Sequence, residues 1–206
     1  MTRTVFVPRE RVVRWFENFA SRHGAASLEV SSGVLRATAP DGALATAHLP
    51  FDEPYDGPAD PVALAAAMSM PTRWGLLLVR KGGFAVAAVE YGTVAASKVG
   101  RRHVQGRTKA GGQSQQRFAR RRDNQARQAY EAAADHAYRV LTGPLTALVC
   151  GGDRHAVEEV LADPRLRGLT AVRVEPWLAV PDPRPSVLAQ AVLDAAAVRV
   201  TVTGEG

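Results

Sequence analysis

The chain has 206 residues, 46% of them apolar and 22% charged, which excludes wholesale disorder and leaves enough apolar surface for a folded core. No apolar run reaches the length of about 18 residues that a membrane span needs, and the amino-terminal residues do not resemble a signal peptide. The single cysteine excludes an internal disulfide bond and a thiolate metal cluster. We therefore expect a cytoplasmic protein without membrane contact.

Residues 1–60 predict a small α+β module followed by a linker. Apolar side chains between Val12 and Phe19 recur at helical spacing, and Gly24 ends this helix. Turn residues then separate three short strands, which we expect at residues 27–30, 34–38 and 43–49. Four prolines between residues 50 and 61 indicate the linker.

Residues 61–206 predict an α/β domain that begins with a short helix at 62–70. Glycine-containing turns then join three strands of an antiparallel meander, at residues 74–79, 84–91 and 93–99. The stretch from Ser114 to Leu141 contains no proline or glycine and favours one long helix. Helices and strands then alternate: strand 145–150, helix 153–161, strand 169–174, helix 186–197 and strand 198–202. This order resembles that of ribonuclease-H-like folds.

The positive charge is concentrated in one segment. The chain has a net charge of +6, yet residues 101–127 hold nine basic residues against the single acid Asp123, a formal charge of +8. The remainder of the chain is therefore slightly acidic. The nine are Arg101, Arg102, Arg107, Lys109, Arg117, Arg120, Arg121, Arg122 and Arg127. Such a local excess is typical of a nucleic-acid contact.

Residues 100–113 predict a loop that projects into solvent, because they are polar, basic and rich in glycine. Gly111 and Gly112 allow a partner to approach the backbone closely. Gln113 is expected at the start of the long helix, where backbone N–H groups point outward. We expect RNA to be contacted by Arg107, Lys109, Arg117, Arg120, Arg121, Arg122 and Arg127. Composition alone fits a flexible turn and a solvated helix equally well.

The surroundings of the Gly-Gly-Gln tripeptide resemble the catalytic domain of archaeal and eukaryotic class-one translation termination factors. In that family Gly-Gly-Gln-Ser is followed, after two variable residues, by Arg-Phe-Ala-Arg. The eight matching positions here are Gly111, Gly112, Gln113, Ser114, Arg117, Phe118, Ala119 and Arg120. The resemblance extends over about residues 74–202 and implies the release-factor catalytic fold.

The whole stretch from Gly106 to Arg122 is most similar to the actinobacterial Vms-like release factor (VLRF) family. This resemblance implies a peptidyl-tRNA hydrolase that releases nascent peptides from stalled or split ribosomes. Gly111, Gly112 and Gln113 would then be catalytic. The implied partners are the peptidyl-transferase centre of the large ribosomal subunit, ribosomal RNA and peptidyl-tRNA. No metal or other cofactor is expected, because the five histidines lack metal-ligand spacing.

Two other functions stay open at this point. One is endonucleolytic cleavage within the terminal CCA of the tRNA, which relatives that depart from Gly-Gly-Gln perform. The other is a ribosome- or RNA-binding module without catalysis. Stop-codon decoding is not expected, because only about 70 residues precede the catalytic region and a decoding domain needs more.

Overall fold

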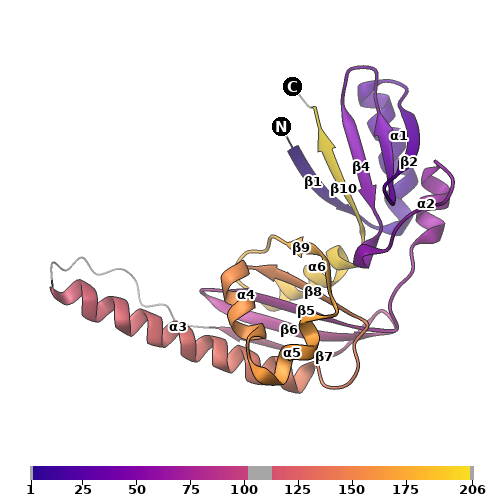
Figure 1. The fold of residues 1–206 in the computed structure, drawn as a ribbon. Coiled ribbons are helices and arrows are strands. Elements are labelled where there is room, and N and C mark those ends of the chain that lie inside the picture. Colours follow the sequence, from indigo (N-terminus) through magenta and orange to yellow (C-terminus); the bar gives the residue numbers. More distant parts are fainter. Residues whose placement is uncertain (1, 102–112, 205–206) are drawn as a thin grey trace. The chain divides into compact units, whose positions relative to one another are not determined.

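The computed structural model describes residues 2–101 and 113–204 (Figure 1). For residue 101 and residues 113–126 it describes only the backbone. The chain forms two compact units. The first unit comprises Met1–Met70 together with Val192–Gly206, and the second comprises Pro71–Ala191. Each unit has its own sheet and is described by itself below.

The first unit is built on a five-stranded antiparallel sheet. Its strands, in spatial order, are β1 (Thr2–Val7), β10 (Val198–Thr203), β4 (Leu44–His48), β3 (Val34–Thr38) and β2 (Ser27–Ser31). The last strand of the chain thus lies between β1 and β4, so the two chain ends belong to the same sheet (Figure 1).

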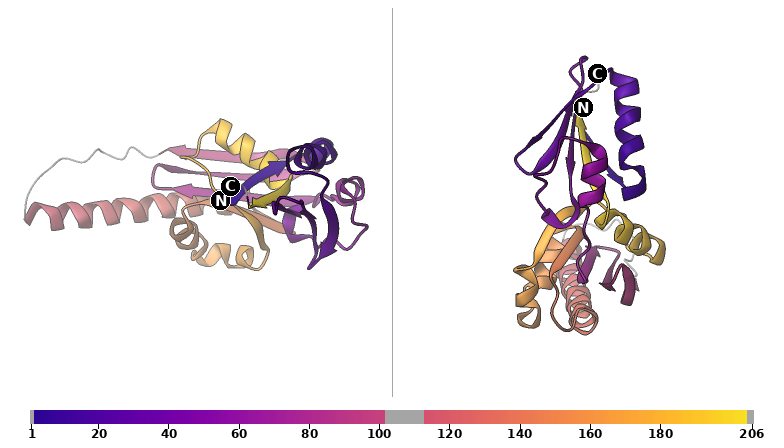
Figure 2. Two further views of the ribbon diagram at one scale, coloured as in Figure 1. Left: turned by 90° about the horizontal axis from the view of Figure 1, so that it is seen from above. Right: turned by 90° about the vertical axis from the view of Figure 1, so that its right-hand side faces the viewer.

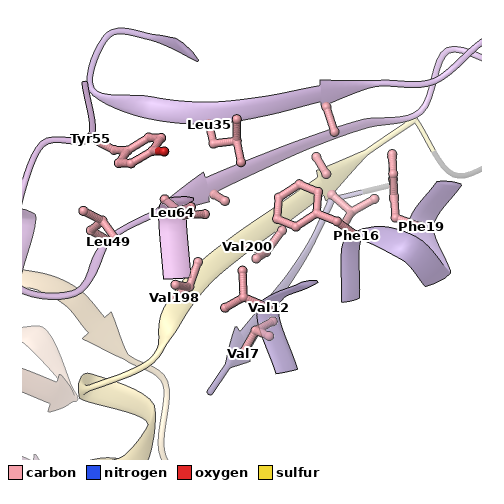
Figure 3. Packing of buried hydrophobic residues seen from close by; sticks show 14 of the residues in the cluster. Val7, Val12, Phe16, Phe19, Leu35, Leu49, Tyr55, Leu64, Val198 and Val200 are labelled. Carbon is pink, nitrogen blue, oxygen red and sulfur yellow. The ribbon is translucent and has the colours of Figure 1, made fainter. Parts of the chain in front are cut away.

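Two helices cover one face of this sheet, α1 (Val12–His23) and α2 (Pro61–Ala67) (Figure 2). Val12, Phe16 and Phe19 project from α1 into the core beside Val200 of β10 (Figure 3). In β10 every second side chain is buried, as expected for a strand with one covered face. Two short 3-10 helices, Arg9–Arg11 and Pro50–Asp52, complete the unit.

The second unit contains a mixed five-stranded sheet. In spatial order its strands are β7 (Thr93–Arg101), β6 (Gly83–Glu90), β5 (Arg73–Arg80), β8 (Ala147–Gly152) and β9 (Arg173–Leu178). The strands β5, β6 and β7 form an antiparallel meander, whereas β8 and β9 run parallel to β5.

Helices lie on both faces of the mixed sheet. One face is covered by α3 (Gln113–Val140) and α4 (Arg154–Leu161), and α6 (Pro185–Ala195) begins on the other (Figure 2). The short helices η3 (Pro164–Leu166) and α5 (Arg167–Thr170) follow α4. Covered on both faces, β5 is buried continuously from Trp74 to Val79.

The structure confirms the mixed α/β class, the meander and the long helix. Asp153 caps α4, since its carboxylate accepts a hydrogen bond from the backbone N–H of Ala156 at 3.2 Å. The strands expected near residues 27–49 lie within one or two residues of β2, β3 and β4. No helix among the described residues is long and apolar enough to cross a membrane.

Three elements differ from the expectations. The strand β1 was not predicted. The strand expected at 169–174 is displaced, because Asp163 caps a helical turn that Pro164 begins, and β9 starts only at Arg173. The strand expected at 198–202 exists, but it lies in the sheet of the first unit, so the contacts group the chain differently from the expected domains 1–60 and 61–206.

Candidate functional site

The predicted site residues fall on one segment and one helix. Gly111, Gly112, Arg107 and Lys109 lie outside the described residues. Gln113 is the first residue of α3, as expected. The backbone of α3 also carries Arg117, Arg120, Arg121 and Arg122, and the side chain of Arg127 is exposed. Residues 102–113, which join β7 to α3, are called the Gly-Gly-Gln segment below.

The helix α3 holds Gln113 far from the packed part of the unit. With 28 residues it is about 42 Å long. Among the residues of α3 whose side chains are described, the stripe that packs on the core runs from Tyr130 through Ala133 and Ala137 to the neighbouring Leu141, at helical spacing. Gln113 precedes Tyr130 by about 26 Å of helix. Figure 1 shows the amino-terminal end of α3 extending away from the sheet.

Phe84 packs against both elements that flank the Gly-Gly-Gln segment, β7 and α3. It is opposite Gly100 of β7 in the strand register, and its ring lies over that glycine: a Cβ atom on Gly100 would be 2.2 Å from Cε1 of Phe84. The same ring stacks on His136 of α3, with centroids 5.4 Å apart and planes inclined by 25°. Only 8% of Phe84 is exposed. This aromatic contact fixes the end of β7 relative to α3.

Arg73 fastens the carboxyl-terminal end of α3. Its Nε donates to Glu90 Oε1 at 2.7 Å, and its two terminal nitrogens donate to the carbonyl oxygens of Thr142 and Pro144. The carbonyl groups that follow a helix have no partner within it, so this guanidinium supplies one. The helix end is thereby tied to the start of β5.

A second arginine joins α3 to η3. Arg165 donates to Asp135 of α3 and to Asp163, each at 2.7 Å, and its guanidinium lies 5.4 Å from the ring centre of Tyr138. Hydrogen bonds from Arg165 lower the pKa of Asp163 to about 2. Both contacts are at the surface, so they orient α3 more than they stabilise the fold.

Sequence reasoning missed Phe84, His136, Arg73 and Arg165. Each acts through a partner far along the chain, which residue spacing does not reveal. Cys150 is buried, and burial raises the pKa of its thiol to about 12. Among the described residues no cluster of three His, Cys, Asp or Glu side chains is arranged to hold a metal ion.

Comparison with protein families matches residues 72–201 to the family described as Actinobacteria/chloroflexi VLRF1 release factor. The match covers more than half of the chain, from the start of the second unit into β10. The chain belongs to this release factor family. The matched range includes Gly111, Gly112 and Gln113 and all of α3.

Two solved structures are also similar to this chain. One is described as an archaeal protein, with 12% identity and a TM-score of 0.40 over 95% of this chain. The other is the archaeal translation termination factor aRF1, with 13% identity and a TM-score of 0.39 over 94% of this chain. The alignments cover 66% and 64% of those chains, so this chain spans slightly less than two thirds of their length. A comparison with curated proteins gave no match.

Proposed function

We propose that this protein is a ribosome-associated peptidyl-tRNA hydrolase that releases nascent peptides from stalled or split ribosomes. One observation carries the proposal. Gly111-Gly112-Gln113-Ser114 is followed at fixed spacing by Arg117-Phe118-Ala119-Arg120, at the start of a 28-residue helix, in a chain that belongs to a release factor family. Spacing maintained over ten residues is much more specific than a glycine pair in a flexible turn.

The proposed reaction is the attack of water on the ester that joins the peptide to the terminal ribose of the tRNA. The water oxygen bonds to the carbonyl carbon, the ribose oxygen leaves, and a proton passes from the water to that oxygen. Such a reaction needs a positioned nucleophile and hydrogen-bond donors that face the developing oxyanion. Gln113 fits the role of donor and water-positioning group, because the first N–H groups of a helix have no partner within it.

The side chain of Gln113 does not titrate near neutral pH, so it is not a general base. We assign the proton transfers to the ribose hydroxyl of the substrate and to ribosomal RNA. Gly111 and Gly112 would let the backbone approach the peptidyl-transferase centre without side-chain clashes. The chain alone should therefore hydrolyse peptidyl-tRNA very slowly, and the large subunit is part of the catalyst.

The fold supports the proposed reach into the ribosome. The helix α3 is packed at one end by Phe84, Arg73 and Arg165, while Gln113 lies about 26 Å of helix before Tyr130. The positions of Arg117, Arg120 and Arg121 are on one side of the helix, at the spacing i, i+3 and i+4. This arrangement suits a helix that lies along RNA phosphates in the cytoplasm, with its first residue at the peptidyl ester.

The test is peptide release from isolated large subunits that hold peptidyl-tRNA. Gln113→Ala should lower the release rate by at least about 100-fold, the loss typical of one oxyanion donor, while subunit binding stays nearly unchanged. Gln115→Ala, at a position that the motif leaves variable, is the matched control and should release at the normal rate. Full release by Gln113→Ala would contradict the catalytic assignment. Normal binding without release by either wild-type or variant protein would favour a non-catalytic binding module.

A further inference from the structure

The carboxyl ends of four strands in the second unit meet at one edge of its sheet. The strands β5, β8 and β9 are parallel, and β7 has the same direction because it is antiparallel to β6, which is antiparallel to β5. Arg80, Gly83 and Arg101 are register neighbours at this edge. The Gly-Gly-Gln segment follows directly after Arg101, so it leaves the sheet at the carboxyl edge.

Two turns at this edge carry basic side chains. Lys81 occupies the turn between β5 and β6, and Arg154 begins α4 after β8; both are exposed. The backbone N–H of Asp153 donates to the carbonyl of Val79 at 2.8 Å, which holds the two turns side by side. The two cations therefore lie on neighbouring turns at the carboxyl edge of the sheet.

Two acids lie near Lys81 and Arg154, and each of them has another partner. Asp182 pairs with Arg80 at 3.5 Å, and the carboxylate of Asp153 caps α4. Within the part of the chain that the structure describes, Lys81 takes part in no ion pair. Arg80, Lys81 and Arg154 against Asp153 and Asp182 leave this edge with a formal excess of one positive charge, and Lys81 and Arg154 are both exposed.

Arg154 is also held in place by an aromatic ring. Its guanidinium carbon lies 4.3 Å from the ring centre of Trp177. The Trp177 indole N–H donates to the carbonyl of Gly152 at 3.3 Å, which fixes the ring at the end of β8. A guanidinium stacked on an indole keeps the N–H donors at its rim free for a phosphate, and its orientation is preorganised.

We propose that Lys81, Arg154 and Trp177 form a second RNA-binding surface, the carboxyl-edge patch, which contacts the phosphate backbone of large-subunit RNA. This proposal rests on the proposed ribosomal function and adds a contact outside α3. The chemistry favours RNA over a protein partner, because the exposed apolar side chains Tyr91 and Val94 lie at the opposite edge, near the turn between β6 and β7. Cations and a stacked guanidinium match phosphates.

The first experiment measures binding to large subunits without tRNA as a function of salt. The double variant Lys81→Ala/Arg154→Ala should bind about tenfold more weakly near physiological salt, and the slope of log affinity against log salt should fall by about 2. The matched control Arg139→Ala/Arg167→Ala removes the same charge from exposed positions in the last turn of α3 and in α5. It should keep the wild-type affinity and slope.

A double variant that binds with the wild-type slope would overturn the carboxyl-edge patch. An equal loss in the control would also overturn it, since the effect would then come from net charge alone. Release measured at saturating protein separates this proposal from the proposed function. The patch variant should still release peptide at the normal rate. A wild-type protein that binds with the expected salt slope but never releases peptide would contradict the proposed hydrolase function and leave the carboxyl-edge patch supported.

A second experiment distinguishes RNA from ribosomal protein. Cys150 is the single cysteine, and it is buried with a raised pKa, so Lys81→Cys introduces one reactive thiol. A photoactivatable cross-linker attached there should join the protein to large-subunit RNA. Cross-linking to ribosomal protein instead of RNA would contradict the proposed partner.

Discussion

Replacing Gly100 by alanine tests how tightly β7 is packed where it enters the Gly-Gly-Gln segment. The added Cβ would lie 2.2 Å from Cε1 and 2.5 Å from Cζ of Phe84. Carbon atoms in contact are about 3.5–4.0 Å apart, so the ring must move by more than about 1 Å. Phe84 is 8% exposed and stacks on His136, which restricts this movement. We expect a loss of about 1–3 kcal/mol in the free energy of unfolding.

The same substitution should cost much less once the ring is absent. Phe84→Ala alone should destabilise the second unit by about 3 kcal/mol. This value is at the lower end of the range for a buried phenylalanine, because Phe84 lies near the beginning of its strand, β6. In that background Gly100→Ala no longer meets Cε1 or Cζ and should be neutral, or stabilising by about 0.5 kcal/mol because alanine restricts the unfolded chain. The double-mutant cycle should therefore show a coupling of at least about 1 kcal/mol.

The assay is urea unfolding followed by tryptophan fluorescence. Trp15→Phe leaves Trp74 and Trp177 as the only tryptophans, and both lie in the second unit, so the signal then reports that unit alone. Gly168→Ala is the control, because a Cβ at Gly168 meets no atom within 4 Å. Additive effects of the Gly100 and Phe84 substitutions would refute the proposed packing of the segment base.

Three further predictions concern the core, the sheet of the first unit and the RNA contact. Burial raises the pKa of Cys150 from 9.0 to about 12, so the contribution of its thiol to the free energy of unfolding is complete below pH 9 and is lost as the pH rises from 9 towards 12. In Cys150→Ala the free energy of unfolding should not show this fall between pH 9 and 12. The same pH dependence in the variant and the wild-type protein would contradict the prediction. Val200→Ala should lower the free energy of unfolding by about 2 kcal/mol, because Val200 is buried in the first unit with 1% of it exposed. Amide hydrogen exchange should become faster in β1 and β4 but not in β5. Equally faster exchange in both sheets would show that β10 is wrongly placed. Reversing Arg117, Arg120 and Arg121 to glutamate should strongly weaken binding to large subunits and lower its salt dependence, and unchanged affinity would contradict an RNA-facing helix.

The long helix was the element best predicted from the sequence. The stretch Ser114–Leu141 contains no helix breaker, and α3 spans Gln113–Val140. The strand expected at 198–202 is also present, as β10. Periodicity does not state which sheet a strand joins, so the insertion of β10 between β1 and β4 could not be predicted. The strand expected from residue 169 begins only at Arg173, because Asp163 caps a helical turn that Pro164 begins.

The candidate site shows the same division between local and long-range information. The Gly-Gly-Gln tripeptide and the arginines after it are close in sequence, so their spacing could be compared with a family. The contacts that hold this region, such as Phe84 with His136 or Arg154 with Trp177, join residues on different elements. Only the fold brings those residues together, and no spacing rule indicates them.

The chemical state of the tRNA released by the wild-type protein distinguishes ester hydrolysis from cleavage of the tRNA. Large subunits that hold labelled peptidyl-tRNA are incubated with the protein, and the released tRNA end and peptide end are analysed by size and mass. Hydrolysis of the ester, assigned to the segment that ends at Gln113, predicts an intact CCA end with a free ribose hydroxyl and a peptide with a free carboxylate. A shortened tRNA, with the terminal nucleotides still attached to the peptide, would contradict hydrolysis and establish nuclease action instead.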